Sequence, residues 1–205
     1  MMRTRIGSLV LVSALCLALS GVVLAQAPPA MKPGPEHQKL SYFVGRWMGE
    51  GTMAASPFGP GGKMSSKEDC EWFEGNFAVV CKSQGTGPTG PVKSLGIMSY
   101  SPEEKVYVYY GLESSGMTMT TVARGTVSGD TWTYSDESTM GGRKIKSRYI
   151  LKVLSATSYE FKWETQGDKG QWTTVASGKS TKSNGEPPAK AGAKPPKPAK
   201  PPKSE

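Results

Sequence analysis

The chain has 205 residues, 37% of them hydrophobic and 20% charged, and its formal net charge is +8. Two arginines near the start and five lysines in residues 183–205 carry most of the excess, so that residues 26–182 retain only about +3. A nucleic-acid-binding protein concentrates positive charge on a folded face, and this distribution therefore argues against nucleic acid as a partner.

The first 25 residues have the order of a secretory signal peptide. Arg3 and Arg5 precede an apolar run over residues 9–24, which ends at a small residue, Ala25. Serines and glycines interrupt the run, and it is short for a membrane span, so a retained membrane anchor is the less favoured alternative. We therefore expect cleavage after Ala25 and an exported protein, periplasmic or extracellular, that does not span the membrane after processing.

The last segment, residues 183–205, is rich in proline, lysine and alanine and contains no aromatic residue. Such a composition cannot bury enough apolar surface to offset the entropy lost on ordering, so it predicts a disordered tail. The tail is either a solvated extension or a basic segment that makes weak contact with anionic envelope surfaces. With a short linker over residues 26–35, the folded domain is expected over residues 36–182.

The two cysteines left after processing are spaced for a disulfide-bridged hairpin. Gly75 and Asn76 lie midway between Cys70 and Cys81, and Gly-Asn is a strong turn signal. Pairing outward from this turn places the cysteines directly opposite each other, within the range that a disulfide bridges. Because disulfides persist in exported proteins, we predict a structural bond; a redox pair is less favoured, since no C-x-x-C is present.

Short β signals follow one another through the whole domain. Runs rich in Val, Thr, Tyr, Trp and Phe alternate with turn clusters about every ten residues, and only residues 36–44 indicate a short helix. Consecutive hairpins favour an all-β fold: an up-and-down antiparallel β-barrel of about ten strands, closed because closure removes exposed edges. The expected strands are 46–54, 64–73, 77–86, 92–100, 105–113, 117–127, 131–137, 143–154, 158–166 and 171–180.

The last hairpins indicate which side chains face the interior. A three-residue turn at 155–157 pairs Tyr149 with Trp163 and Leu151 with Phe161, and it places opposite charges together on the other face. We therefore expect an aromatic interior that would line a ligand cavity. Its members are Trp132, Tyr134, Tyr149, Phe161, Trp163 and Trp172, with Tyr107 and Tyr109 added if their face of the strand 105–113 looks inward.

The start of the domain resembles a known class of barrels. In "LSYFVGRWMGEG" a short helix leads into Gly45 and Trp47, as in lipocalin and fatty-acid-binding (calycin) barrels. The resemblance implies that the tryptophan plugs the closed end beneath the helix and that the glycine permits close approach. Together with "CEWFEGNFAVVC", "GTVSGDTWTY" and "RYILKVLSATSYEFKWE", the segment is similar to the bacterial secreted domain-of-unknown-function 1579 family over about residues 33–180. That resemblance implies a lipocalin-like barrel and no established activity.

The opening motif is also distantly similar to nitrobindin, a haem-binding barrel that ligates iron through a histidine well along the chain. The single histidine here, His37, lies in the expected helix, so the resemblance does not extend to haem ligation. In many lipocalins a basic residue of the last strand also covers the plug tryptophan. Lys179 is the only candidate within the expected last strand.

Residue patterns typical of enzymes and metal sites are absent from the sequence. His37 has no evident nucleophile partner, no Cys/His cluster has metal spacing, and the carboxylates at Glu103 and Asp136 are expected on the solvated surface. Methionines such as Met117 and Met119 could hold Cu(I), although methionine more often fills barrel interiors. We therefore predict no catalytic residue, no metal and no cofactor.

Two functions remain. The favoured one is non-catalytic binding of a small apolar or amphipathic molecule inside the barrel, since eight to ten strands can enclose one such ligand. The alternative is a side-chain-filled structural or envelope-interaction protein with a basic Pro-Lys tail, in which the aromatic residues are simply core. An interior closed by Trp47, Trp163 and Trp172 would favour the alternative, and a continuous cavity would favour binding.

Overall fold

The computed structural model describes residues 31–56, 59–114, 121–140, 142–167 and 169–183. The predicted signal peptide, nearly all of the predicted tail, and Met117 and Met119 lie outside these ranges. Within them, no helix is long and apolar enough to cross a membrane.

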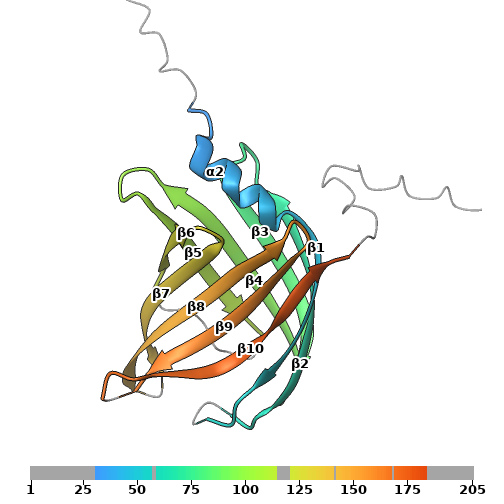
Figure 1. Cartoon of the computed structure of the whole chain (residues 1–205), viewed down its shortest axis with the longest axis vertical. Helices are drawn as coiled ribbons and strands as arrows, with labels where there is room; N and C mark the ends of the chain where they lie inside the picture. The colour runs from blue at the N-terminus through green and yellow to red at the C-terminus, as the bar shows by residue number, and fades with distance from the viewer. Residues whose placement is uncertain (1–30, 57–58, 115–120, 141, 168, 184–205) are drawn as a thin grey trace, which may run out of the picture. The chain divides into compact units, whose positions relative to one another are not determined.

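The domain is a closed antiparallel barrel of ten strands in sequence order, completed where β1 pairs with β10 (Figure 1). The predicted all-β up-and-down barrel is confirmed, and the predicted strands agree closely except that β6 begins later. The strands are β1 Gly45–Met53, β2 Gly62–Trp72, β3 Ala78–Gly87, β4 Gly90–Ser101, β5 Val106–Glu113, β6 Ala123–Ser128, β7 Thr131–Met140, β8 Arg143–Ser155, β9 Ser158–Gln166 and β10 Trp172–Lys182.

A short helical segment lies across one end of the barrel (Figure 1). The helix α2, Pro35–Lys39, continues directly into a 3-10 turn, η1, Leu40–Phe43, where one helix was predicted over residues 36–44. His37 is buried, and its Nδ1 accepts a hydrogen bond from the Gly34 N–H at 3.2 Å. The histidine therefore caps the helix and is not presented to a ligand.

Hydrogen bonds fasten this segment to two parts of the barrel wall. The Tyr42 hydroxyl contacts the carbonyl oxygens of Ser155 and Ser158, at the turn between β8 and β9, at 3.1 and 3.0 Å. The Tyr107 hydroxyl, from β5, donates to the Glu36 carboxylate at 2.5 Å. The segment is thus held as a cover over the barrel end.

Trp47 closes the same end from within. Its side chain is only 1% exposed, its indole Nε1 donates to the Phe43 carbonyl at 2.7 Å, and its ring centre lies 4.9 Å from that of Tyr159. The Lys182 Nζ lies 5.0 Å from the centre of the Trp47 ring. The basic residue that covers the tryptophan is therefore Lys182, because β10 runs two residues beyond its predicted end, whereas Lys179 is exposed.

The predicted registers of two hairpins, β2–β3 and β8–β9, are confirmed. Cys70 pairs with Cys81 across β2 and β3, and the two are joined by a disulfide. In β8 and β9, Tyr149 pairs with Trp163. The turn between the cysteines has positive φ at both Gly75 and Asn76, which explains why these two residue types occupy it.

The expected interior position of Trp172 is wrong. Trp172 pairs with Gln166 on the outer face, is 36% exposed, and stacks against Arg148, whose guanidinium carbon lies 4.2 Å from the ring centre. Arg148 in turn forms an ion pair with Glu164 at 2.6 Å. A connection with an even number of residues would have placed Trp172 on the same face as Trp163. The connection over residues 167–171 has an odd number, so Trp172 lies on the outer face with Gln166.

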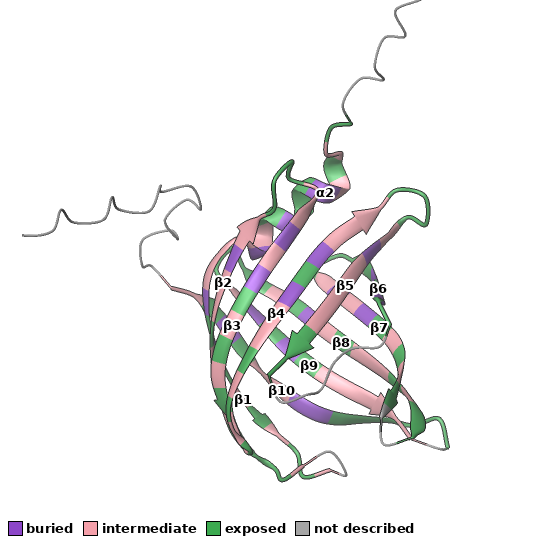
Figure 2. Cartoon of the chain, turned by 180° about the vertical axis from the view of Figure 1, so that it is seen from behind, coloured by how far each residue is buried: buried purple, intermediate pink, exposed green. Residues whose placement is uncertain are grey.

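The open question about the strand 105–113 is also resolved. Tyr107 and Tyr109 face the interior, in line with Met98 on β4, which is buried. Figure 2 shows buried and exposed positions alternating along β4. The outer face is apolar as well, since Ile97 and Leu112 are exposed there, which is why the sequence pattern could not assign a face.

Candidate functional site

Inward aromatic rings of the barrel lie over glycines of the neighbouring strand. A Cβ atom added at Gly125 would lie 2.6 Å from the ring of Tyr134, its partner across β6 and β7. A Cβ atom at Gly178 would lie 2.6 Å from the ring of Phe161, its partner across β9 and β10. Each ring therefore occupies the space that the side chain of a larger residue would need at the glycine position.

Tyr149 indicates that the lumen is open. It faces the interior with Leu151 and Phe161, yet 36% of it is exposed, whereas these two neighbours are buried. An inward side chain in a closed barrel is reached by solvent only through a lumen that its neighbours leave unfilled. Near the helical cover the interior is packed instead, since Tyr107 and Trp132 are buried with their ring centres 4.7 Å apart.

Glu68 carries a carboxyl group into this lumen. It lies on β2, opposite the inward residues Trp47 and Ser83, and two positions before the buried Cys70. Burial raises the pKa of Glu68 from an ordinary 4.5 to about 7. Among the residues that the structure describes, no basic side chain forms an ion pair with Glu68 and no hydrogen bond reaches its carboxyl group.

Tyrosines at inward positions of three other strands share the lumen with this carboxyl group. Tyr109 of β5, Tyr149 of β8 and Tyr159 of β9 all have a raised pKa, chiefly because the barrel wall around them solvates the phenolate poorly, and the charge of Glu68 raises each further. These hydroxyls therefore stay protonated and can donate hydrogen bonds. We refer to Glu68, Tyr109, Tyr149 and Tyr159 as the lumen cluster.

The charged residues at inward positions are mainly acidic. Glu113 and Asp136 follow the inward alternation of β5 and β7, so they add two carboxylates to that of Glu68. Asp136 is half-buried, which corrects its expected place on the solvated surface. The basic inward positions of the described strands are at the ends: Lys182 against the plug tryptophan, and Arg143 at the first residue of β8.

Glu68 also lies beside the disulfide. A carboxyl oxygen of Glu68 and the Sγ atoms of Cys70 and Cys81 all lie within 4.8 Å of one another, and this is the one group of three metal-binding residue types within the described parts of the chain. Metals bind thiolates, and bridged sulfurs are not thiolates. The oxidised protein thus offers a lone carboxyl group here and no metal centre.

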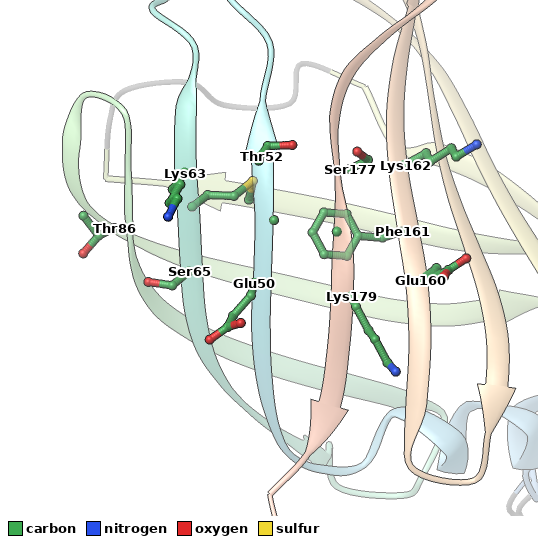
Figure 3. A pocket seen from close by; sticks show the side chains of 13 residues that line it. Glu50, Thr52, Lys63, Ser65, Thr86, Glu160, Phe161, Lys162, Ser177 and Lys179 are labelled. Carbon is green, nitrogen blue, oxygen red and sulfur yellow. The ribbon is translucent and has the colours of Figure 1, made fainter.

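A cavity of about 1000 Å³ opens along the wall formed by β2, β1, β10 and β9 (Figure 3). At its centre Gly51 pairs with Gly178, so that the wall bears no side chains there. Met64 and Phe161 border it from the inward face, and Phe161 stacks on Tyr149 with ring centres 6.0 Å apart, so this part adjoins the lumen cluster. Exposed polar residues of the outer face complete the lining: Glu50, Thr52, Lys63, Ser65, Thr86, Glu160, Lys162 and Lys179.

The eight aromatic residues predicted to line a cavity fall into three groups. One is outside the barrel, Trp172, and two belong to the packed closed end, Tyr107 and Trp132. The five that lie around the lumen are Tyr109, Tyr134, Tyr149, Phe161 and Trp163.

Sequence reasoning missed Glu68, although a signal was available. Glu68 lies two residues before Cys70, so the disulfide hairpin already placed both on one face of the strand. A buried disulfide on that face would have directed the carboxyl group inward as well.

Glu68→Gln is expected to remove a pH dependence of folding stability. The folded protein holds the Glu68 proton more tightly than the unfolded chain does, so the wild type should lose stability as the pH rises from about 4.5 through about 7. The full shift corresponds to about 3 kcal/mol, and lumen water reduces this to about 2 kcal/mol. Urea unfolding at pH 5 and pH 8 measures it: relative to the wild type, Glu68→Gln should gain about 2 kcal/mol between these values.

The matched control is Glu71→Gln, on the outer face of the same strand. Glu71 lies near Lys82, at 4.0 Å, and is not part of the lumen. Its substitution should leave the pH dependence of the wild type intact. Parallel pH profiles for the wild type and Glu68→Gln would contradict the raised pKa.

Comparison with known proteins agrees with this fold. No curated protein matches the chain significantly. The crystal structure of Rv2717c from M. tuberculosis is 12% identical, with a TM-score of 0.52, over 73% of this chain and 98% of that one. The S-type phycobiliprotein lyase CPES from Guillardia theta is 10% identical, with a TM-score of 0.50, over 74% of this chain and 94% of that one. At such identities the likeness concerns the barrel fold alone. Residues 32–182 match the family described as protein of unknown function DUF1579, and the chain belongs to that family.

Proposed function

We propose that this protein is an exported, non-catalytic binding protein that holds a small apolar or amphipathic molecule in the barrel lumen. The observation that carries the proposal is Tyr149, which faces inward in a closed ten-stranded barrel and is nevertheless 36% exposed. Barrels of this size leave room for one small ligand when their side chains do not fill the interior.

The composition of the lumen supports the same proposal. Phe161, Trp163 and Met64 offer apolar contact at inward positions. A few polar groups stand among them, including the Glu68 carboxyl and the Tyr134 hydroxyl, which is buried without a hydrogen-bond partner among the described residues. Small-molecule sites are typically apolar with a few such placed polar groups.

The alternative of a filled barrel is less well supported. It would need Trp47, Trp163 and Trp172 to close the interior together. Trp172 lies on the outer face, and Trp163 is only half-buried, so just one of the three acts as a plug.

The disulfide supports export. Cys70 and Cys81 are almost completely buried and form a bond that persists in oxidising compartments. This agrees with the leader-like residues 1–25 of the sequence. A cytosolic protein would keep such cysteines reduced.

A dye-binding experiment tests the proposed function. Nile red, a neutral apolar dye, should bind the wild type saturably with a rise in fluorescence. Ser83→Phe adds a ring at an inward position opposite Glu68 and should weaken binding at least about tenfold, because the ring occupies the lumen. Gln84→Phe adds the same ring at the next, exposed position of β3 and should leave binding unchanged.

Trp163→Ala provides a second variant that removes bulk instead of adding it. Loss of its apolar contact should weaken dye binding about tenfold while the barrel still unfolds cooperatively. Absence of saturable binding by the wild type, or equal binding by Ser83→Phe and Gln84→Phe, would overturn the proposal. If the proposal holds, native mass spectrometry of protein purified from its own source gives the mass of the ligand that it carries.

A further inference from the structure

We propose that the lumen selects amphipathic molecules bearing a protonated amine, with Glu68 as the counter-ion and the rings of Tyr109, Tyr149 and Tyr159 around the ammonium group. This inference rests on the proposed binding function and specifies the ligand class. Its physical basis is a half-buried carboxyl group at an inward position of β2, opposite Trp47 and Ser83, which forms no ion pair with any residue that the structure describes.

A buried carboxylate without a partner is costly, and proteins normally pair such groups. The described ion pairs that involve other acidic residues lie at the surface of the barrel or on its helical cover, for example Glu104 with Arg124 and Glu36 with Lys39. Glu68 differs in lying inside and unpaired. A cationic ligand would supply the missing partner.

The aromatic surroundings fit the same ligand class. Tyr109, Tyr149 and Tyr159 face inward from three separate strands, as Glu68 does from β2. The faces of such rings attract an ammonium group. A carboxylate with aromatic rings about it is therefore suited to a cation.

An anionic amphiphile, such as a fatty acid, fits the lumen less well. Its carboxylate would meet Glu68, with Glu113 and Asp136 also at inward positions of the wall. The inward basic groups of the described strands are Lys182, which lies 5.0 Å from the Trp47 ring at the closed end, and Arg143 at the rim. Neither forms an ion pair with Glu68. The charge pattern thus favours a cationic head group.

The apolar part of the ligand has apolar side chains beside this cluster within the lumen. Tyr149 stacks on Phe161, and Met64 and Trp163 also lie at inward positions. An alkyl or aryl tail could follow these side chains while its ammonium group stays at Glu68.

Calorimetric titration with three ten-carbon probes tests the selectivity. Decylammonium, decanol and decanoate share a tail and differ in head group, and each is used below its critical micelle concentration at pH 8. The wild type should bind decylammonium at least about tenfold more tightly than either other probe, the gain expected from a hydrogen bond to a charged group.

Variants assign the selectivity to one side chain. Glu68→Gln keeps the shape and removes the charge, so it should weaken decylammonium binding at least about tenfold and leave decanol binding within about twofold. Glu71→Gln makes the same change on the outer face of β2 and should alter neither. Thermal unfolding of each variant confirms that it is folded.

The pH profile gives a readout that a merely structural role would not change. Between pH 6 and pH 8, decylammonium binding to the wild type should strengthen as Glu68 ionises, since its pKa is about 7 before the ligand binds. In Glu68→Gln this dependence should vanish. The groups facing Glu68 from β5, β8 and β9 are tyrosines whose raised pKa values lie above this window.

The outcomes separate this inference from the proposed function. Equal affinity for the three probes, or an unchanged decylammonium affinity in Glu68→Gln, would overturn amine selectivity while leaving binding in the lumen intact. Binding of Nile red without binding of decylammonium would overturn it too. Failure of Nile red and all three probes would overturn the binding function itself.

Discussion

Replacing Trp47 with alanine should lower the free energy of unfolding by about 3–5 kcal/mol. The side chain is 1% exposed, packs against Tyr159, and donates a hydrogen bond to the Phe43 carbonyl, so its removal leaves a cavity and an unpaired acceptor at the closed end. Guanidinium unfolding followed by circular dichroism measures the change.

The neighbouring Met48 is a matched control. It lies on the outer face of the same strand and is 40% exposed, so Met48→Ala should cost less than about 1 kcal/mol. Similar losses from the two substitutions would show that the closed end is not packed around Trp47 as described.

Removing the disulfide is the second change with a large expected effect. The double variant Cys70→Ala/Cys81→Ala should lose roughly 3 kcal/mol, because the cross-link no longer restricts the unfolded chain around its 11-residue separation. Two buried side chains are also shortened, which adds to the loss. Chemical unfolding under non-reducing conditions measures it.

Reduction of the wild type provides the companion measurement. The reduced wild type should lose most of the stability that the double variant loses, since both lack the cross-link. If reduction left the unfolding midpoint unchanged, the bond would contribute nothing to stability. A role for the cysteines other than cross-linking would then have to be sought.

The lumen cluster and the closed end make opposite contributions to stability. Trp47 and the disulfide stabilise the barrel, whereas Glu68 is a half-buried acid whose raised pKa costs stability as the pH rises from about 4.5 to about 7. Functional sites commonly carry such locally unfavourable features, which the rest of the fold tolerates. The expected gain in stability for Glu68→Gln at pH 8, combined with its expected loss of amine binding, is the signature of such a site.

The sequence alone determined the barrel and much of its register. Strand alternation and turn chemistry are local properties, so the Gly75-Asn76 turn was enough to pair Cys70 with Cys81. The same reasoning paired Tyr149 with Trp163 in the last hairpins. These predictions were confirmed because a two-residue period and a short turn leave few alternatives.

The tertiary structure decided what depends on closure and on distant strands. An odd-length connection placed Trp172 outside, and the inward face of β5 became clear only when β4 and β6 lay beside it. The lumen cluster joins Glu68 of β2 to tyrosines of β5, β8 and β9, which lie far from it in the sequence. A two-residue period in the sequence indicates which side chains share a face of a strand. What that face encloses depends on the closed barrel, because all ten strands together exclude water from the interior.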